Sequence, residues 1–240
     1  DIEISNTELV LADLAAVEKL YQKAIKNTKS GQKDGLPLKA LLERVLPTLE
    51  EGESARTLSY DDEELKLLKG FQLLTIKPVL YVANVSEEGF NNNPHLDVVT
   101  NFANTEGAQV VAICADIEAE ISELDLEEKQ EFLSEMGQTE SGLDRLIKSG
   151  YALLGLQTYF TAGVQEVRAW TVNVGDSAPQ AAGKIHGDFE KGFIRAETIA
   201  FDDFIQYGGE KGAKEAGKLR SEGKDYIVQD GDVVHFLFNV

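Results

Sequence analysis

The chain changes character at a segment that reads Lys77-Pro78-Val79-Leu80-Tyr81-Val82-Ala83-Asn84-Val85-Ser86-Glu87-Glu88-Gly89-Phe90. The apolar run at 79–83 is typical of a parallel strand that is covered on both faces. Open α/β sheets bind ligands at the carboxyl ends of such strands, where this run gives way to Asn84. Asn84 carries both a hydrogen-bond donor and an acceptor, and Glu87 carries acceptors only. The segment therefore predicts a strand whose end can read the edge of a purine.

A second apolar run, at 108–115, completes the unit that the first begins. Between the two runs, Asn93-Pro94 opens a helix that continues to Glu106, and Gly107 ends it. The order strand, helix, strand predicts a βαβ unit with a parallel pair of strands.

The residues before this unit are helical in pattern. One amphipathic helix is predicted over 6–29 with Asn6 as its N-cap, and a polar turn follows at 30–35. A second helix begins near Pro37, and a third is predicted over 61–74. The apolar face of the second helix consists of Leu38, Leu41, Leu42, Val45 and Leu49. Two amphipathic helices joined by a short polar turn predict an antiparallel helical hairpin.

Helices are predicted over 116–136 and 142–154 after the βαβ unit, and the pattern then changes again. Strands are predicted at 167–174 and 193–199, with a helix at 178–186 between them. Asp230-Gly231 separates two apolar runs, 225–228 and 233–238, which predicts a β-hairpin. Short strands around one helix predict a small β-grasp module in the last third of the chain.

Composition narrows the class of protein. The net charge is −19, and residues 1–154 hold 14 Lys and Arg against 29 Asp and Glu. Such acidity repels nucleic acid over most of the surface. One cysteine excludes an internal disulfide and fits the cytoplasm. The sequence has neither a signal peptide nor an apolar run long enough for a membrane span, so we expect no membrane partner. Because residue 1 is Asp rather than Met, we expect a fragment or a processed form.

Four segments resemble the YchF family, the Obg-like ATPases of the P-loop GTPase superfamily, and the resemblance extends over nearly the whole chain. They are Asn84–Pro94, Leu156–Gly163, His186–Ala196 and Asp225–Asp232. Typical members of the superfamily have Asn-Lys-x-Asp where this chain has Asn84-Val85-Ser86-Glu87. The longer acid and the absent Lys weaken a guanine clamp, and the family that the chain resembles prefers ATP.

The resemblance implies a role for each matching residue. Asn84 would bond the adenine edge, Val85 would pack near it, and Glu87 would complete the pocket. The backbone of Cys114 and Ala115 would approach the base. The implied fold is α/β: a partial P-loop NTPase-type parallel sheet with a helical hairpin insertion and a C-terminal β-grasp (TGS) domain. The implied domains are a nucleotide-binding remnant at 1–5, the hairpin at 6–74, the second half of the nucleotide-binding domain at 75–154 and the TGS domain at 155–240.

The chain departs from the family where phosphate chemistry is concerned. The phosphate-binding loop, the Mg²⁺-binding hydroxyl and the switch motif belong to an N-terminal portion that this sequence lacks, so we expect no catalytic residue and no metal ligand here. The segment Gly212–Leu219 nearly fits a phosphate loop. Leu219 replaces the hydroxyl that would hold Mg²⁺, however, and no apolar strand leads into Gly212, which favours a solvated helix or loop. ATP with Mg²⁺ would be bound by the full-length protein.

The resemblance also implies partners, namely ATP and the ribosome (its large subunit) or RNA, contacted through the TGS domain and the helical insertion. The basic residues proposed for RNA contact are Lys184, Lys191 and Arg195, with Phe189 and Phe193 interleaved; the alternative is an ordinary mixed-charge surface. His186 with Asp188 is interpreted as a helix end rather than an acid–base pair, and Cys114 as an inert thiol. The alternative function for the chain is a non-enzymatic adaptor that binds the ribosome or a protein.

Overall fold

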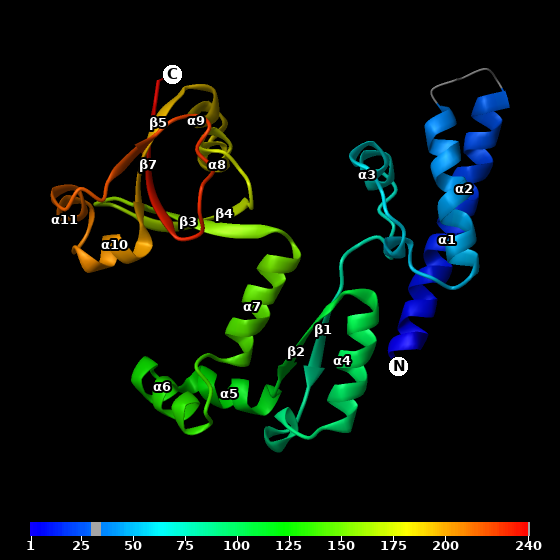
Figure 1. The fold of residues 1–240 in the computed structure, drawn as a ribbon, viewed down its shortest axis with the longest axis horizontal. Coiled ribbons are helices and arrows are strands. Elements are labelled where there is room, and N and C mark those ends of the chain that lie inside the picture. Colours follow the sequence, from blue (N-terminus) through cyan, green and yellow to red (C-terminus); the bar gives the residue numbers. More distant parts are fainter. Residues whose placement is uncertain (30–34, 240) are drawn as a thin grey trace. The chain divides into compact units, whose positions relative to one another are not determined.

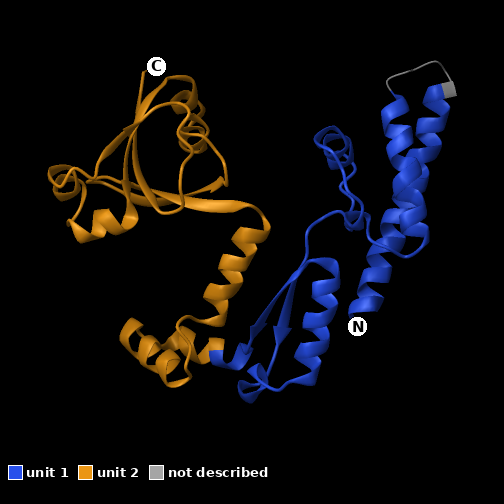
Figure 2. Cartoon of the chain, in the orientation of Figure 1, with its two compact units in different colours: residues 1–117 blue, residues 118–240 orange. Residues whose placement is uncertain are grey.

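The computed structural model describes residues 1–29 and 35–239, and it has a mixed α/β fold. The chain divides into two compact units, residues 1–117 and 118–240, which are coloured separately in Figure 2. Figure 1 gives the labels of the helices and strands. Within the described residues, none of the helices is both long enough and apolar enough to cross a membrane.

Unit 1 begins with two helices, α1 (Ile2–Lys29) and α2 (Leu36–Glu50), which lie side by side in Figure 1. The predicted apolar stripes face each other and form a core, and α2 begins at Leu36 with Pro37 in its first turn, as expected. The predicted cap at Asn6 is wrong, because α1 begins at Ile2 and Asn6 lies inside it. The predicted polar turn falls largely on residues 30–34, which lie outside the described residues.

The chain returns from the hairpin through η2 (Ala55–Thr57) and α3 (Asp62–Lys69). Asp61 caps α3 in a capping box with Glu64. The helix ends at Lys69, before the predicted end at residue 74, because the backbone that follows it is hydrogen-bonded to α1 instead of continuing the helix. The carboxylate of Asp13 on α1 is buried and accepts the N–H groups of Leu74 and Thr75 at 2.8 and 2.7 Å.

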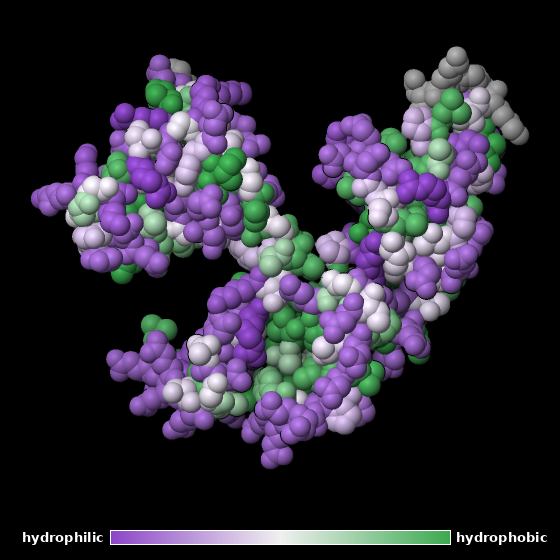
Figure 3. Space-filling model, viewed as in Figure 1, coloured by the Kyte–Doolittle hydropathy of each residue, from purple (hydrophilic) through white to green (hydrophobic). Residues whose placement is uncertain are grey.

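The predicted βαβ unit is present as β1 (Leu80–Asn84), α4 (Pro94–Glu106) and β2 (Gln109–Ile113), with β1 and β2 parallel. Helix α4 has its predicted ends, because Asn93 caps its first turn and Gly107 adopts the left-handed conformation at its last. Coverage of both faces of β1 is not observed. The described sheet has two strands, Val82 is 45% exposed, and Figure 3 shows hydrophobic residues uncovered over β1 and β2.

The acidic stretch after β2 forms two helices, α5 (Ala115–Glu123) and α6 (Leu126–Glu135), rather than the single helix predicted. Asp125 accepts the N–H groups of Glu127 and Glu128 and starts a new helix in place of continuing the first. Helix α7 (Gly142–Leu153) follows. Glu118 accepts the N–H groups of Gly142 and Leu143 at 2.7 and 3.1 Å, which fixes the start of α7.

Unit 2 contains a five-stranded sheet in the order β4-β3-β7-β5-β6. Strands β3 and β7 are parallel, and the other neighbouring pairs are antiparallel. The strands are β3 (Leu156–Ala162), β4 (Val167–Asn173), β5 (Phe193–Ala200), β6 (Arg220–Glu222) and β7 (Asp232–Phe238). The helices of this part of the chain are α8 (Ala178–Ile185), α9 (Gly187–Lys191), α10 (Phe201–Gln206) and α11 (Glu210–Glu215).

The core of this sheet lies between its inner face and α8. Tyr159 is fully buried there, and its hydroxyl donates to the carbonyl of Ala181 at 2.9 Å. Strand β3, which contributes Tyr159, had no counterpart among the predicted strands.

The predicted hairpin at 225–238 is wrong, because only its second half forms a strand. The buried carboxylate of Asp232 accepts the Tyr226 hydroxyl at 2.6 Å and the N–H of Gln229 at 2.9 Å. Gly231 donates its N–H to Thr158 on β3. These bonds hold 226–231 as a loop, so β7 pairs with β3 and β5 instead.

Candidate functional site

The candidate site lies where β1 and β2 end, within unit 1. The two strands are in register with Asn84 opposite Ile113, and the N–H of Val85 donates to the carbonyl of Ile113 at 2.8 Å. The Oδ1 atom of Asn84 accepts the N–H of Ala115 at 3.1 Å. Because the pair is parallel, both carboxyl ends meet at one edge of the sheet, and the structure brings Asn84, Val85 and Ala115 together there.

The hydrogen bond from Ala115 determines which group of the Asn84 side chain is free to bind a ligand. Its carbonyl oxygen is occupied, and its amide nitrogen has no partner among the described residues. An amide nitrogen can only donate. Asn84 is exposed, so this donor is available to an acceptor on a ligand, such as a ring nitrogen of a purine.

The loop after Val85 presents Glu87 at the start of the short helix η3 (Glu87–Phe90). The Glu87 side chain is exposed and has no ion-pair partner within the described residues. The side-chain nitrogen of Asn93 donates to the carbonyl of Gly89 at 2.9 Å, which ties the loop to the start of α4. A Cβ at Gly89 would lie 3.0 Å from Cβ of Val85, so the turn is closely packed and a larger residue would have to displace Val85 by a few tenths of an ångström.

Cys114, which precedes Ala115, is 1% exposed and free. Burial shields a thiol from oxidants, and the inertness of Cys114 stays a prediction. Its backbone lies next to the Asn84–Ala115 hydrogen bond, while its side chain belongs to the core.

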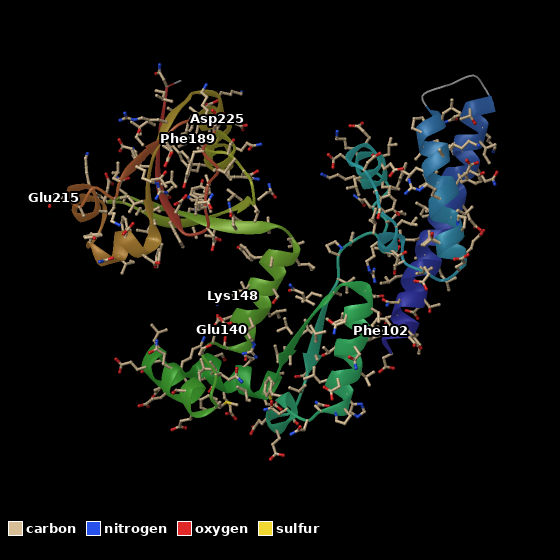
Figure 4. The ribbon with its side chains drawn as sticks, viewed as in Figure 1. Phe102, Glu140, Lys148, Phe189, Glu215 and Asp225 are labelled. Carbon is tan, nitrogen blue, oxygen red and sulfur yellow. The ribbon has the colours of Figure 1, made fainter. Side chains whose placement is uncertain are left out.

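A polar cluster connects strand β1 and the short helix η2 to the end of α4. Glu106 at the end of α4 accepts the hydroxyl of Tyr81 at 2.8 Å and pairs with Arg56 at 3.2 Å. Burial raises the pKa of Tyr81, and a hydrogen bond with Asn6 opposes that shift. The ring of Tyr81 also packs edge-on against Phe102, which Figure 4 labels on α4. These contacts fix the direction of β1, and hence the position of Asn84.

The proposed RNA-contacting residues lie on unit 2 and are partly neutralised by nearby carboxylates. Lys184 on α8 is 3.9 Å from Asp176, and Arg195 on β5 pairs with Glu197 at 3.1 Å. Lys191, the last residue of α9, has no ion pair among the described residues.

The aromatic residues interleaved with these basic residues do not form a base-stacking surface. Phe193 is 4% exposed, and Phe189 stacks on Phe238 with ring centroids 3.7 Å apart. Both rings therefore belong to the packing of the sheet.

Two further candidates prove to be structural. His186 ends α8 and caps α9, and its Nδ1 accepts the N–H of Asp188 at 3.2 Å. The glycine-rich segment from Gly212 forms part of α11 and the turn after it. Its N–H groups are used within that helix and turn, including Ala216 to Gly212 and Lys218 to Ala213, so they are unable to cradle a phosphate.

Within the part of the chain that the structure describes, no three His, Cys, Asp or Glu side chains gather as a metal site would require. Sequence reasoning missed one polar and aromatic pocket on unit 2, formed around Phe160, Phe201 and Asp230. Strand β3 reads Leu-Gln-Thr-Tyr-Phe-Thr-Ala, which does not alternate between apolar and polar residues, so its pattern contains no signal for this face of the sheet.

The comparisons with known proteins show which family the chain resembles over its length. Residues 156–239 match the family model YchF-GTPase_C, described as a protein of unknown function (DUF933). The "Ribosome-binding ATPase YchF" of Haemophilus ducreyi is 60% identical over 240 residues, which cover 100% of this chain and 66% of that protein. The protein of the same name from Bacillus subtilis is 53% identical over 243 residues, with the same coverage.

Solved structures extend the likeness to the fold. The Schizosaccharomyces pombe YchF GTPase matches with a TM-score of 0.86 and 32% identity, covering 99% of this chain and 65% of that one. A GTP-binding protein from Pyrococcus horikoshii matches with a TM-score of 0.59 at 17% identity, and this shows a likeness of fold only. The chain is thus of the mixed α/β class whose structural neighbours are YchF GTPases. It belongs to the YchF family, and it spans 66% of the length of the curated relatives that it matches.

Proposed function

We propose that this chain is the base-reading and ribosome-contacting part of a YchF-type ATPase. The observation that carries the proposal is the 3.1 Å hydrogen bond from the Ala115 N–H to Asn84 Oδ1. It joins the loops at the ends of two parallel strands and leaves the Asn84 amide as a donor, with the exposed Glu87 carboxylate on the next turn. The names of the relatives support nucleotide hydrolysis and ribosome binding as the activities of the whole protein.

The donor set suits adenine. Adenine carries an exocyclic amine, which donates, and ring nitrogens, which accept. Glu87 has only acceptors to offer that amine, and Asn84 has a donor for a ring nitrogen. Val85, half-buried beside them, would pack near the base, and the backbone of Cys114 and Ala115 would border it. The relatives are named both ATPase and GTPase, so base preference is the property to test.

The described residues supply no set of ligands for Mg²⁺, and we assign none to them. Bound with ATP in the full-length protein, Mg²⁺ would supply positive charge that stabilises phosphoryl transfer. We propose that this chemistry, with the phosphate-binding loop, belongs to residues upstream of the chain. We therefore expect no ATP hydrolysis by the 240-residue chain alone. Measurable turnover by this chain would show that catalysis does not require those residues.

We also propose an identity for each part of the chain. Residues 6–74 would be the helical insertion, preceded by a remnant at 1–5 and followed at 75–154 by the second half of the nucleotide-binding domain. Residues 155–240 would be a TGS domain, and the strand order β4-β3-β7-β5-β6, with β3 and β7 parallel, supports a β-grasp fold for it. Ribosome binding by this domain and by the insertion would place the protein in the cytoplasm.

Base preference is testable in a full-length protein that carries this segment. Calorimetric titration with ATP and GTP is expected to show tighter binding of ATP. Glu87→Asp is expected to shift the ratio of ATP to GTP affinity toward GTP, because it restores the Asp that typical members of the GTPase superfamily have at this position. Glu88→Asp is the matched control, since Glu88 is the next exposed acid on η3 and has no assigned role. An unchanged ATP to GTP ratio in Glu87→Asp would show that Glu87 does not select the base.

The alternative, a non-enzymatic adaptor, makes a different prediction for ribosome binding. If the chain is an adaptor, its sedimentation with ribosomes disappears when Lys191 and Arg195 are replaced and survives the replacement of Asn84. If nucleotide binding controls the contact, replacement of Asn84 in the full-length protein abolishes it as well.

A further inference from the structure

A pocket on the outer face of the unit 2 sheet combines aromatic and acidic side chains. Tyr159 on β3 points into the core, so Phe160, the next residue, lies on the opposite face. There its ring meets that of Phe201 on α10, with centroids 5.6 Å apart. The pocket has a volume of about 360 Å³ and is lined by Phe160, Ala200, Phe201, Asp202, Asp230 and Gly231.

The two carboxylates of this pocket lack a counter-charge. Asp202 and Asp230 are both exposed, and neither has a Lys, Arg or His within 4.0 Å among the described residues. Their neighbour Asp203, by contrast, pairs with Lys218 at 3.2 Å. Asp230 is held in place, because its Oδ1 accepts the N–H of Thr158 at 2.8 Å.

The rings remain open to a ligand. Phe201 is 45% exposed although it packs against Phe160, which is half-buried. An aromatic face attracts a cation, and a guanidinium does so best because its plane can stack on the ring while its N–H groups bond a carboxylate. Two aromatic rings beside two unpaired carboxylates therefore match the chemistry of an arginine side chain.

We propose that this pocket binds an arginine-rich segment of a partner protein. The local charge is compatible with a basic partner, because residues 155–240 hold 13 Asp and Glu against 9 Lys and Arg, and the carboxylates that line the pocket are among those without an ion pair in the described residues. It argues against RNA at this face, since Asp202 and Asp230 would repel phosphates. The pocket is separate from the strand ends of unit 1, and the proposal does not depend on nucleotide binding.

The experiment uses the whole 240-residue chain and a fluorescein-labelled decapeptide of alternating arginine and leucine, measured by fluorescence anisotropy at 150 mM salt. The test variant is Asp202→Asn with Asp230→Asn, which preserves an oxygen to accept the Thr158 N–H. Removing both charges is expected to weaken binding by about tenfold, since each exposed ion pair contributes only modestly to affinity. Phe201→Ala is a second test variant, expected to weaken binding through the lost ring.

The matched control removes two charges elsewhere on unit 2. Asp225 and Glu215 are exposed, line no part of the pocket, and are labelled in Figure 4. Asp225→Asn with Glu215→Gln is expected to change binding by less than about twofold.

Two results would overturn the proposal. One is equal weakening in the control and test variants, which would mean general attraction to an acidic protein. The other is displacement of the peptide by a 12-nucleotide RNA whose own binding is lost in Phe201→Ala, which would make the face an RNA site. Because no nucleotide is present, neither result bears on the base site.

Discussion

Two buried threonines show how differently the same side chain can act in the two units. Thr75 Oγ1 accepts the N–H of Ala55 at 3.0 Å and donates to Asp13 at 2.6 Å. Thr198 is also fully buried, but its hydroxyl has no partner among the described residues. A buried polar group without a partner costs free energy, and one with two good partners stabilises the fold. Replacing each of these threonines by valine therefore compares the loss of a well-bonded hydroxyl with the loss of an unbonded one.

We expect Thr75→Val to lower the free energy of unfolding by about 2 kcal/mol, because it leaves the Ala55 N–H unsatisfied. We expect Thr198→Val to raise it by about 1 kcal/mol, because valine has the same shape and no hydroxyl to desolvate. Urea unfolding followed by circular dichroism measures both. A loss of stability in Thr198→Val would mean that the hydroxyl has a partner, such as a bound water.

Tyr226 is expected to make the free energy of unfolding depend on pH in the alkaline range. Burial, and then its hydrogen bond to Asp232, raise the pKa of Tyr226 to about 12, above the ordinary tyrosine value of 10.0. The folded chain thus keeps a proton that the unfolded chain releases. This stabilisation is complete below pH 10 and is lost as the pH rises from 10 to 12. The loss is at most about 1.4 kcal/mol per pH unit, and less because the ring is partly exposed.

Tyr226→Phe should remove this pH dependence together with the hydrogen bond. We expect the wild-type chain to be more stable than Tyr226→Phe at pH 8, and the difference to shrink toward pH 11. Urea unfolding at each pH gives both values. A difference that is the same at pH 8 and pH 11 would show that the tyrosine does not titrate in this range.

At the scale of single elements, the sequence predicted correctly those helix ends that are set by adjacent residues. Helix α4 has its predicted bounds because Asn93 and Gly107 act on their own turns. The acidic helix was predicted as one element because the restart at Asp125 depends on a cap inside an otherwise helical pattern. The prediction of a hairpin at 225–238 was wrong because Asp232 folds the segment back on itself through Tyr226 and Gln229, and because Gly231 donates to the carbonyl of Thr158 on the distant strand β3.

The candidate base site follows the same rule. The end of the predicted strand indicated Asn84 and Glu87, whereas Val85, Cys114 and Ala115 were named only through the resemblance to the YchF family. The pairing of Asn84 with Ala115 depends on the parallel register of two strands, which local pattern does not specify. The pocket at Phe160 and Phe201 was missed for a similar reason, since its residues come from three separate elements.

Two helical glycines give opposite predictions for substitution by alanine. A Cβ on Gly150 of α7 would meet nothing within 4 Å, whereas a Cβ on Gly212 of α11 would lie 1.9 Å from the Tyr207 carbonyl oxygen. We expect Gly150→Ala to stabilise the chain by about 1 kcal/mol through helix propensity. We expect Gly212→Ala to destabilise it by about 1–3 kcal/mol through overpacking. Thermal unfolding of both variants is the measurement, and equal effects would contradict the close contact at Gly212.

At the scale of the whole molecule, the sheets of the two units differ in the number of their strands and in how completely they are buried. The sheet of unit 2 has five strands and a core of fully buried residues such as Tyr159 and Ala196. The described sheet of unit 1 has two strands, and Val82 on β1 is 45% exposed. Two strands with one covered face are close to the limit of independent stability.

Native-state hydrogen exchange measures this difference directly, because amides exchange when their segment opens. We expect peptides that cover β5 and β7 to exchange at least about a hundredfold more slowly than peptides that cover β1 and β2, which corresponds to about 2.7 kcal/mol in opening free energy. Helix α2, whose Leu42 and Val45 are fully buried, is the control within unit 1 and should exchange slowly. If β1 and β2 were as protected as β5 and β7, the exposed face of β1 would have to be covered in solution. If α2 exchanged as fast as β1, the weakness would belong to the whole of unit 1 rather than to its sheet.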